Sequence, residues 1–85
     1  MSSNFDEKKT PFNKLLNENW DYVYNYILKK TSNEYVSEEI TIQTFSKAFQ
    51  KIKLYDKKFL FKTWLISIAK NTYSDQLRKK KTIID

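Results

Sequence analysis

Not one of the 85 residues in this chain is glycine. Phosphate-cradling loops, dinucleotide-binding fingerprints and type I′ hairpin turns all need a residue that tolerates positive φ, which is the usual role of glycine. Architectures that depend on these loops and turns are therefore disfavoured. The absence of glycine instead fits helices that are joined by short connections.

The chain also contains no histidine and no cysteine. It therefore offers no disulfide bonds and no thiolate metal sites, and it lacks the usual zinc ligands and the commonest general base. We predict a protein that is not an enzyme and that needs no metal and no cofactor. A chain of this length forms one domain, with a core near the lower size limit for a fold without such cross-links.

The start of the chain and its hydropathy bear on its location. Residues 1–9 are polar and unpatterned, which predicts a flexible N-terminal arm and not a signal peptide. The uncharged stretches are much shorter than the roughly 20 residues that span a bilayer. We therefore expect a cytoplasmic protein without membrane insertion.

Apolar residues recur at helical spacing in three segments. They predict an all-α, compact three-helix domain over residues 10–81, followed by a tail at 82–85. The first helix has Thr10 as its N-cap and Pro11 in its first turn, and it runs to about Lys30. We expect the domain to be a monomer.

The second helix starts in the capping-box pattern Thr31-Ser32-Asn33-Glu34, in which Thr31 is the predicted cap and Ser32 or Asn33 would serve equally well. It runs to about Ile52 and has two sides of different polarity. The apolar side contains Phe45, Ala48, Phe49 and Ile52. The opposite side is a polar stripe of Glu39, Gln43, Ser46 and Gln50.

The third helix follows a short cationic connection at residues 53–58 and runs from about Phe59 to Lys80. Its apolar side contains Phe61, Trp64, Leu65, Ile68, Ala69 and Thr72. At about 100° per residue, a set of hydroxyl and cationic side chains lies well away from that side, with Asn71 at its border. This set comprises Thr63, Ser67, Lys70, Ser74, Arg78 and Lys81.

Charge is distributed unevenly along the chain. Residues 1–50 hold 6 basic and 7 acidic residues, whereas residues 51–81 hold 10 basic and 2 acidic residues. A polarised basic half points to a polyanionic partner more than uniform basicity does. A merely solvated charged surface is the alternative, because charge alone does not decide between the two.

The third helix carries the motif F-x-x-W-L-x-x-I-A-x-N-x-x-x-D-x-x-R-K-K over residues 61–80. This motif resembles region 2 of the extracytoplasmic-function (ECF) sigma factors of bacterial RNA polymerase. The second helix is similar to the family in part. Its Thr44-Phe45 pair fits, whereas Glu39 stands in place of an Asp and Ile42 in place of a Gln.

The resemblance covers roughly residues 12–81 and implies binding to core RNA polymerase and recognition and melting of the −10 promoter element. Family members continue into region 4, a helix-turn-helix domain that residues 1–85 do not supply, so we expect an excised domain in preference to an unusual single-domain relative. The implied docking surface for the β′ clamp helices is Glu39, Ile42, Gln43 and Ser46. Binding of the −10 element, including bases of its non-template strand, is expected from the following DNA-binding residues: Lys53, Tyr55, Lys57, Lys58, Lys62, Lys70, Asn71, Ser74, Arg78, Lys79 and Lys81.

Some residues keep two interpretations. Trp64 follows the apolar side and fits the core better than direct base stacking. Tyr55 either stacks on a base or covers the core, and we leave these two open. The cations at 79–81 either favour the helix dipole or contact phosphates, and we prefer phosphates. Asp75 is expected to pair with a cation such as Arg78 or Lys79.

Two other functions also stay open. The domain is alternatively a protein-interaction module that an anti-sigma factor or polymerase binds without direct DNA reading. In that case DNA binding would be absent or independent of salt. The second is a basic amphipathic third helix that lies on an anionic membrane.

Overall fold

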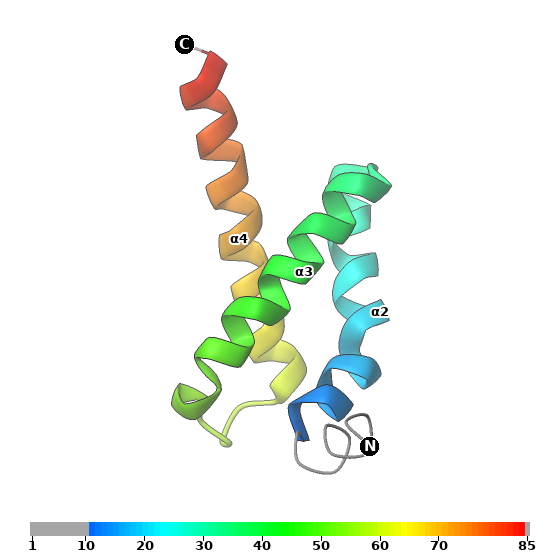
Figure 1. The fold of residues 1–85 in the computed structure, drawn as a ribbon, viewed down its shortest axis with the longest axis vertical. Coiled ribbons are helices and arrows are strands. Elements are labelled where there is room, and N and C mark those ends of the chain that lie inside the picture. The colour runs from blue at the N-terminus through cyan, green and yellow to red at the C-terminus, as the bar shows by residue number, and fades with distance from the viewer. Residues whose placement is uncertain (1–10, 85) are drawn as a thin grey trace, which may run out of the picture.

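The computed structural model describes residues 11–84, with side chains for residues 12–79, and it forms three α-helices and one 3-10 turn (Figure 1). The helices are α2 (Pro11–Thr31), α3 (Glu34–Gln50) and α4 (Phe61–Ile84), and the 3-10 turn η1 (Ile52–Leu54) lies between α3 and α4. The predicted all-α, three-helix fold is confirmed, and residues 11–84 contain no strand. The predicted arm at residues 1–9 lies outside the described residues.

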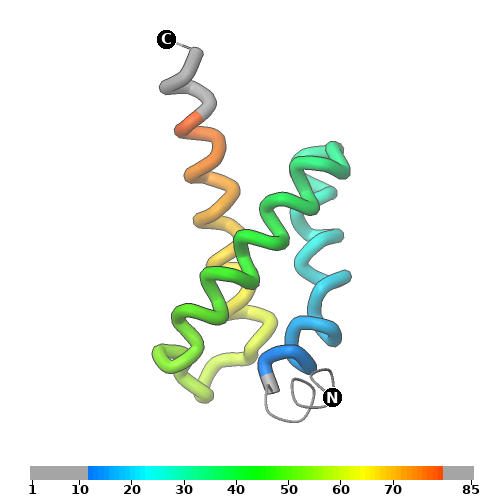
Figure 2. The backbone as a smooth tube through the Cα atoms, in the orientation of Figure 1, coloured from blue at the N-terminus to red at the C-terminus, as the bar shows by residue number. Residues whose placement is uncertain are grey.

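α3 lies between the other two helices and contacts both of them (Figures 1 and 2). α2 and α4 also touch each other. The connection between α3 and α4 lies at the same end of the bundle as the start of α2, and the C-terminal part of α4 extends past the other helices (Figure 1). All three helices therefore contact one another, and α3 has an interhelical seam on each of two sides.

Ser32 and Asn33 alone join α2 to α3, and they turn the chain without glycine. Ser32 has φ 55, in the left-handed region that glycine usually occupies after a helix. Asn33 caps α3, because its Oδ1 accepts the backbone N–H of Val36 at 3.0 Å. The predicted cap Thr31 is wrong, since this residue still belongs to α2. Its Oγ1 instead accepts the backbone N–H of Asn33 at 3.1 Å.

The apolar core lies where α3 meets the other two helices. It consists of Phe12, Val23, Ile27, Ile40, Phe45, Ala48, Leu65, Ile68 and Ala69. Because α3 is covered on two sides, it also buries the small polar residues Ser37, Thr41 and Thr44. The hydroxyl of each donates to the backbone carbonyl four residues earlier at 2.7 Å. Among the described residues, no buried side-chain polar atom lacks a partner.

One predicted core position of α3 lies at the surface instead. Phe49 belongs to the predicted apolar side, but 56% of it is exposed. Its ring still contacts Phe12 edge to face, with 5.2 Å between the centroids. The buried band of α3 instead passes through Thr41 and Thr44, because these smaller residues let neighbouring helices approach closely.

α4 follows the prediction on its apolar side. Its buried residues are Leu65, Ile68, Ala69 and Thr72, and Phe61 and Trp64 are half-buried against the core. The helix begins at Phe61, not at Phe59, and continues past the predicted end at Lys80 to Ile84, so residues 82–84 belong to it. No helix in the described part of the chain is long and apolar enough to cross a membrane.

Candidate functional site

A groove between α3 and α4 collects part of the predicted DNA-binding side of α4. This α3–α4 groove has a volume of about 520 Å³ and is lined by Lys47, Gln50, Lys51, Ile68, Asn71, Ser74, Asp75 and Arg78. Asn71, Ser74 and Arg78 meet there because they lie on successive turns of one helical face. Three cations and one carboxylate line the groove, so its net charge suits an anionic ligand.

Asp75 is the centre of the ionic contacts in the α3–α4 groove. The Arg78 guanidinium pairs with it from one turn farther along α4, as the sequence predicted. From α3, Lys47 Nζ lies 3.9 Å from Asp75 Oδ2 and donates to Thr72 Oγ1 at 3.1 Å. Partly exposed ion pairs of this kind contribute only about 0–1 kcal/mol to stability. Their main effect is geometric, since they hold two cations beside one carboxylate between the helices.

The predicted DNA contacts omit three residues of the groove, which are Lys47 and Gln50 of α3 and Lys51, the residue that caps its C-terminus. A signal for two of them exists, because Lys47 and Lys51 are spaced i, i+4 and therefore share one helical face. The prediction divides α3 into an apolar side and a polar stripe only, so it does not include this face. The structure gives α3 a third surface, which borders α4.

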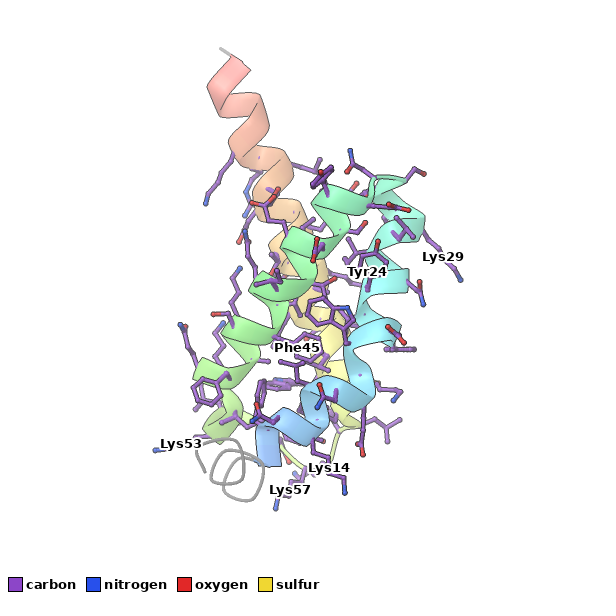
Figure 3. All side chains as sticks on the ribbon, turned by 45° about the vertical axis from the view of Figure 1, so that its right-hand side comes forward. Lys14, Tyr24, Lys29, Phe45, Lys53 and Lys57 are labelled. Atoms are coloured by element: carbon purple, nitrogen blue, oxygen red, sulfur yellow. The ribbon has the colours of Figure 1, made fainter. Side chains whose placement is uncertain are left out.

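The connection between α3 and α4 carries further predicted DNA contacts. Lys53, Lys57 and Lys58 are exposed there, and Figure 3 shows Lys53 and Lys57 pointing away from the bundle. Asp56 shapes the turn, because its Oδ1 accepts the backbone N–H of Lys58 at 2.9 Å. The connection also exposes large apolar side chains that the sequence prediction does not single out. They are Leu54, Phe59 and Leu60.

Tyr55 belongs to an aromatic cluster with Phe61 and Trp64. Its ring centroid lies 5.4 Å from that of Phe61 and 5.0 Å from that of Trp64. Its hydroxyl donates to the backbone carbonyl of Phe59. Trp64 in turn packs against the buried core. The geometry therefore favours the core interpretation of Trp64 and the covering role of Tyr55.

Lys62 lies apart from the α3–α4 groove and contacts α2. Its Nζ donates to Asn19 Oδ1 at 2.8 Å and lies 5.3 Å from the ring centroid of Tyr22. Lys70 and Lys79 are exposed on α4 and do not line the groove. Lys81 is also a predicted DNA contact, but its side chain lies outside the described ones. The structure thus brings together some of the predicted DNA contacts and separates others.

The predicted polymerase-binding residues lie on another side of α3, where Glu39, Ile42 and Ser46 are exposed and Gln43 is half-buried. Ile42 and Ser46 line a second groove, the α2–α3 groove, with a volume of about 630 Å³. Its other lining residues are Phe12, Asn13, Leu16, Trp20, Phe45 and Phe49. The predicted docking stripe therefore borders an apolar groove that periodicity alone did not indicate.

No group of three or more acidic, histidine or cysteine side chains within the described residues is arranged to hold a metal ion. The two grooves differ in their linings. One is cationic and polar, and the other is aromatic and aliphatic.

Comparison with known proteins gives a family match and several curated relatives. The family described as Sigma-70 region 2 matches residues 15–83. The ECF RNA polymerase sigma factor SigM of Bacillus subtilis (strain 168) is 34% identical over 59 residues, which cover 69% of this chain and 36% of SigM. The ECF RNA polymerase sigma factor SigW of the same strain is 34% identical over 61 residues, covering 72% of this chain and 33% of SigW.

A third relative is the ECF RNA polymerase sigma factor BldN of Streptomyces coelicolor (strain ATCC BAA-471 / A3(2) / M145). It is 28% identical over 71 residues, which cover 82% of this chain and 27% of BldN. No solved structure matches the chain. The chain thus spans between 27% and 36% of the length of these relatives. The family match covers most of the chain and agrees with the motif on α4, and the chain therefore belongs to the sigma-70 region 2 family.

Proposed function

We propose that the chain is the part of a sigma factor that binds core RNA polymerase and recognises and melts the −10 promoter element. The observation that carries this proposal is the α3–α4 groove. In a member of the sigma-70 region 2 family, it unites Asn71, Ser74 and Arg78 with Lys47 of α3 and with Lys51, which follows α3. Residues 10–81 form the domain that acts. It acts by binding alone, so the proposal requires no catalytic residue and no nucleotide hydrolysis.

In this proposal the α3–α4 groove holds the phosphate backbone of the −10 element. Lys47, Lys51 and Arg78 attract phosphates, and the released counterions make this binding depend on salt. Asn71 and Ser74 add neutral hydrogen-bonding groups to the lining of the groove. Such groups reach sugars and base edges, and contacts with base edges are the source of sequence preference.

Melting follows from capture of unstacked bases beside the connection. The exposed apolar side chains of the connection offer a surface on which a base of the non-template strand packs, and the cluster of Tyr55, Phe61 and Trp64 attaches the connection to the core. The exposed lysines of the connection hold the adjoining phosphates. Each captured base stabilises the open state, because unstacking costs free energy that the contacts of the extruded base offset.

Core RNA polymerase binds another side of α3, through its β′ clamp helices. Glu39, Gln43 and Ser46 supply polar contacts, and the exposed Ile42 supplies an apolar contact at the edge of the α2–α3 groove. An apolar centre with a polar rim is the usual anatomy of a protein interface. In this arrangement α3 contacts polymerase on one side while its lysines face DNA on another.

The test is the binding of a fluorescent −10 non-template strand by the chain in complex with core RNA polymerase. We expect this strand to bind at least about tenfold more tightly than a scrambled strand. Asn71→Ala should reduce that ratio, because it removes a side chain of the α3–α4 groove. Asn25→Ala is the matched control, since Asn25 is exposed on α2. Equal affinity for the two strands in the wild-type complex overturns the proposal.

The second candidate function is a protein-interaction module that an anti-sigma factor or polymerase binds without DNA reading. The α2–α3 groove favours it, because Phe12, Trp20 and Phe49 form an aromatic surface that phosphate binding does not need. Polymerase binding together with absent or salt-independent DNA binding would support this candidate. The membrane alternative is disfavoured, because Leu65 and Ile68 of α4 are buried in the core.

A further inference from the structure

The contact between Lys62 and α2 differs from the contacts of the other predicted DNA-binding cations. Lys62 stands in the first turn of α4, and its Nζ donates to Asn19 Oδ1 at 2.8 Å. Asn19 is only 5% exposed, and its Nδ2 donates to the carbonyl of Leu15 at 2.8 Å, which fixes the amide on α2. The ammonium also lies over the ring of Tyr22, 5.3 Å from its centroid.

The amide of Asn19 depends on this lysine. With Nδ2 bound to the carbonyl of Leu15, the Oδ1 atom is directed at the Lys62 ammonium. A buried amide oxygen without a donor is unfavourable, so the pair stays together unless another donor replaces the ammonium. The ring of Tyr22 gives the same cation a second favourable site on α2. Lys62 is therefore bound to α2 at two points.

The position of Lys62 in the chain links this contact to the proposed base-binding surface. Phe61 and Trp64, on either side of it, form the aromatic cluster with Tyr55. The Trp64 backbone N–H donates to the Leu60 carbonyl at 3.1 Å, and this bond begins the helical hydrogen bonding of α4. A shift of the first turn of α4 would therefore move the cluster and the connection together.

We propose that Lys62 is a positioning residue for promoter recognition and not a phosphate contact. It attaches the first turn of α4 to α2 through Asn19 and Tyr22, and in this way it sets the place of the aromatic cluster and of the connection. This inference rests on the proposed function for its recognition step. The attachment itself is a property of the free chain.

The first experiment therefore uses the free chain and needs no DNA. Amide hydrogen exchange of Trp64 should be about tenfold faster in Lys62→Met than in wild type, which corresponds to ~1.4 kcal/mol. Asn19→Ala should produce the same acceleration, and the double variant should add little, because both changes remove one contact. Lys62→Arg should stay close to wild type. Lys70→Met is the matched control, since Lys70 is exposed farther along α4.

The second experiment uses the chain in complex with core RNA polymerase and a panel of −10 strands with single-base changes. Lys62→Met should change discrimination within the panel by about fivefold or more. It should leave the slope of log K against log salt at the wild-type value, because no phosphate contact is lost. Lys62→Arg should restore the wild-type discrimination.

Two outcomes overturn the inference. The first is wild-type amide exchange in Lys62→Met and Asn19→Ala, which would mean that the attachment does not order the first turn of α4. The second is unchanged discrimination in Lys62→Met together with a slope of log K against log salt that falls by about 0.7. Such a fall corresponds to the loss of one phosphate contact on a single strand. If the wild-type complex does not discriminate among strands, the proposed function is contradicted. The exchange experiment then still decides whether Lys62 attaches α4 to α2.

Discussion

The two grooves beside α3 differ in chemistry although the same helix lines both. The α2–α3 groove is aromatic and aliphatic and includes the exposed Ile42 and Phe49. The α3–α4 groove is cationic and includes Lys47 and Lys51. α3 achieves this with positions only a few residues apart, because rotation by one position moves a side chain about 100° around the helix.

The difference indicates how one short helix serves two partners of unlike chemistry. Aromatic side chains bury large areas and bind protein surfaces, whereas lysines and arginine exchange counterions for phosphates. Small hydroxyl residues fill the space between the two grooves, so neither surface has to supply the whole core. Each prediction below starts from a side chain that lines one of the two grooves.

The largest effect is expected from Phe45→Ala. Phe45 is 2% exposed, stacks on Trp20 with 5.8 Å between the centroids and lies at the centre of the bundle in Figure 3. Its truncation leaves a cavity under the α2–α3 groove, and we expect a loss of about 3–5 kcal/mol in the free energy of unfolding. Urea denaturation followed by far-UV circular dichroism measures this loss. Phe49→Ala is the control, since its exposed ring should matter far less.

A smaller effect is expected on polymerase affinity. Ile42→Lys places a charge at the exposed edge of the α2–α3 groove, and it should weaken binding to core RNA polymerase by about 2 kcal/mol. Glu39→Lys should act in the same direction. Fluorescence anisotropy of labelled chain titrated with core polymerase measures the change. Lys51→Ala should leave this affinity unchanged. A loss of equal size in Lys51→Ala would mean that polymerase also contacts the α3–α4 groove.

The lysines of the α3–α4 groove should determine the salt dependence of DNA binding. Lys47→Ala and Lys51→Ala should each lower the slope of log K against log salt by about 0.7 on single strands. Affinity should fall alike for all sequences, because phosphate contacts carry no sequence information. A salt series with the polymerase complex measures the slope. Lys29→Ala is the control on α2, and an identical slope in all three variants would contradict the assignment.

The smallest effect is expected from Asp75→Asn. This change removes the one carboxylate of the α3–α4 groove, which pairs with Arg78 and faces Lys47. Stability should change by no more than about 1 kcal/mol, because partly exposed pairs contribute little. DNA affinity should rise modestly and equally for all sequences, since repulsion of phosphates is reduced. A fall in affinity would mean that Asp75 is needed to place the cations.

The sequence predicted α4 better than α3, for a physical reason. α4 packs on one side, so a single helical period separates the buried Leu65 and Ile68 from the exposed Lys70 and Asn71. α3 packs on two sides, and its buried band contains hydroxyls that hydropathy does not mark as core. This is why the exposure of Phe49 was not anticipated.

The candidate site shows the same contrast, because its residues on α4 could be predicted and those near α3 could not. The α4 side of the α3–α4 groove follows from periodicity and from the resemblance. The i, i+4 spacing of Lys47 and Lys51 shows that they share a face, but whether that face borders α4 depends on how α3 is rotated against α4, which no local pattern encodes. The contact of Lys62 with Asn19 joins residues 43 positions apart in the chain, so it was beyond any argument from spacing.

The buried hydroxyls of Thr41 and Thr44 also bear on how the domain can move. Each is satisfied by a carbonyl of its own helix, so sliding of α3 along its neighbours breaks neither bond. The apolar contacts around them have no preferred direction. Among the described residues, three partly buried side-chain hydrogen bonds link different helices, and they join Thr31 with Ser37, Lys47 with Thr72 and Lys62 with Asn19. A partner that binds α3 in both grooves can therefore displace it by a small shear movement, with the core still closed, once these three bonds break.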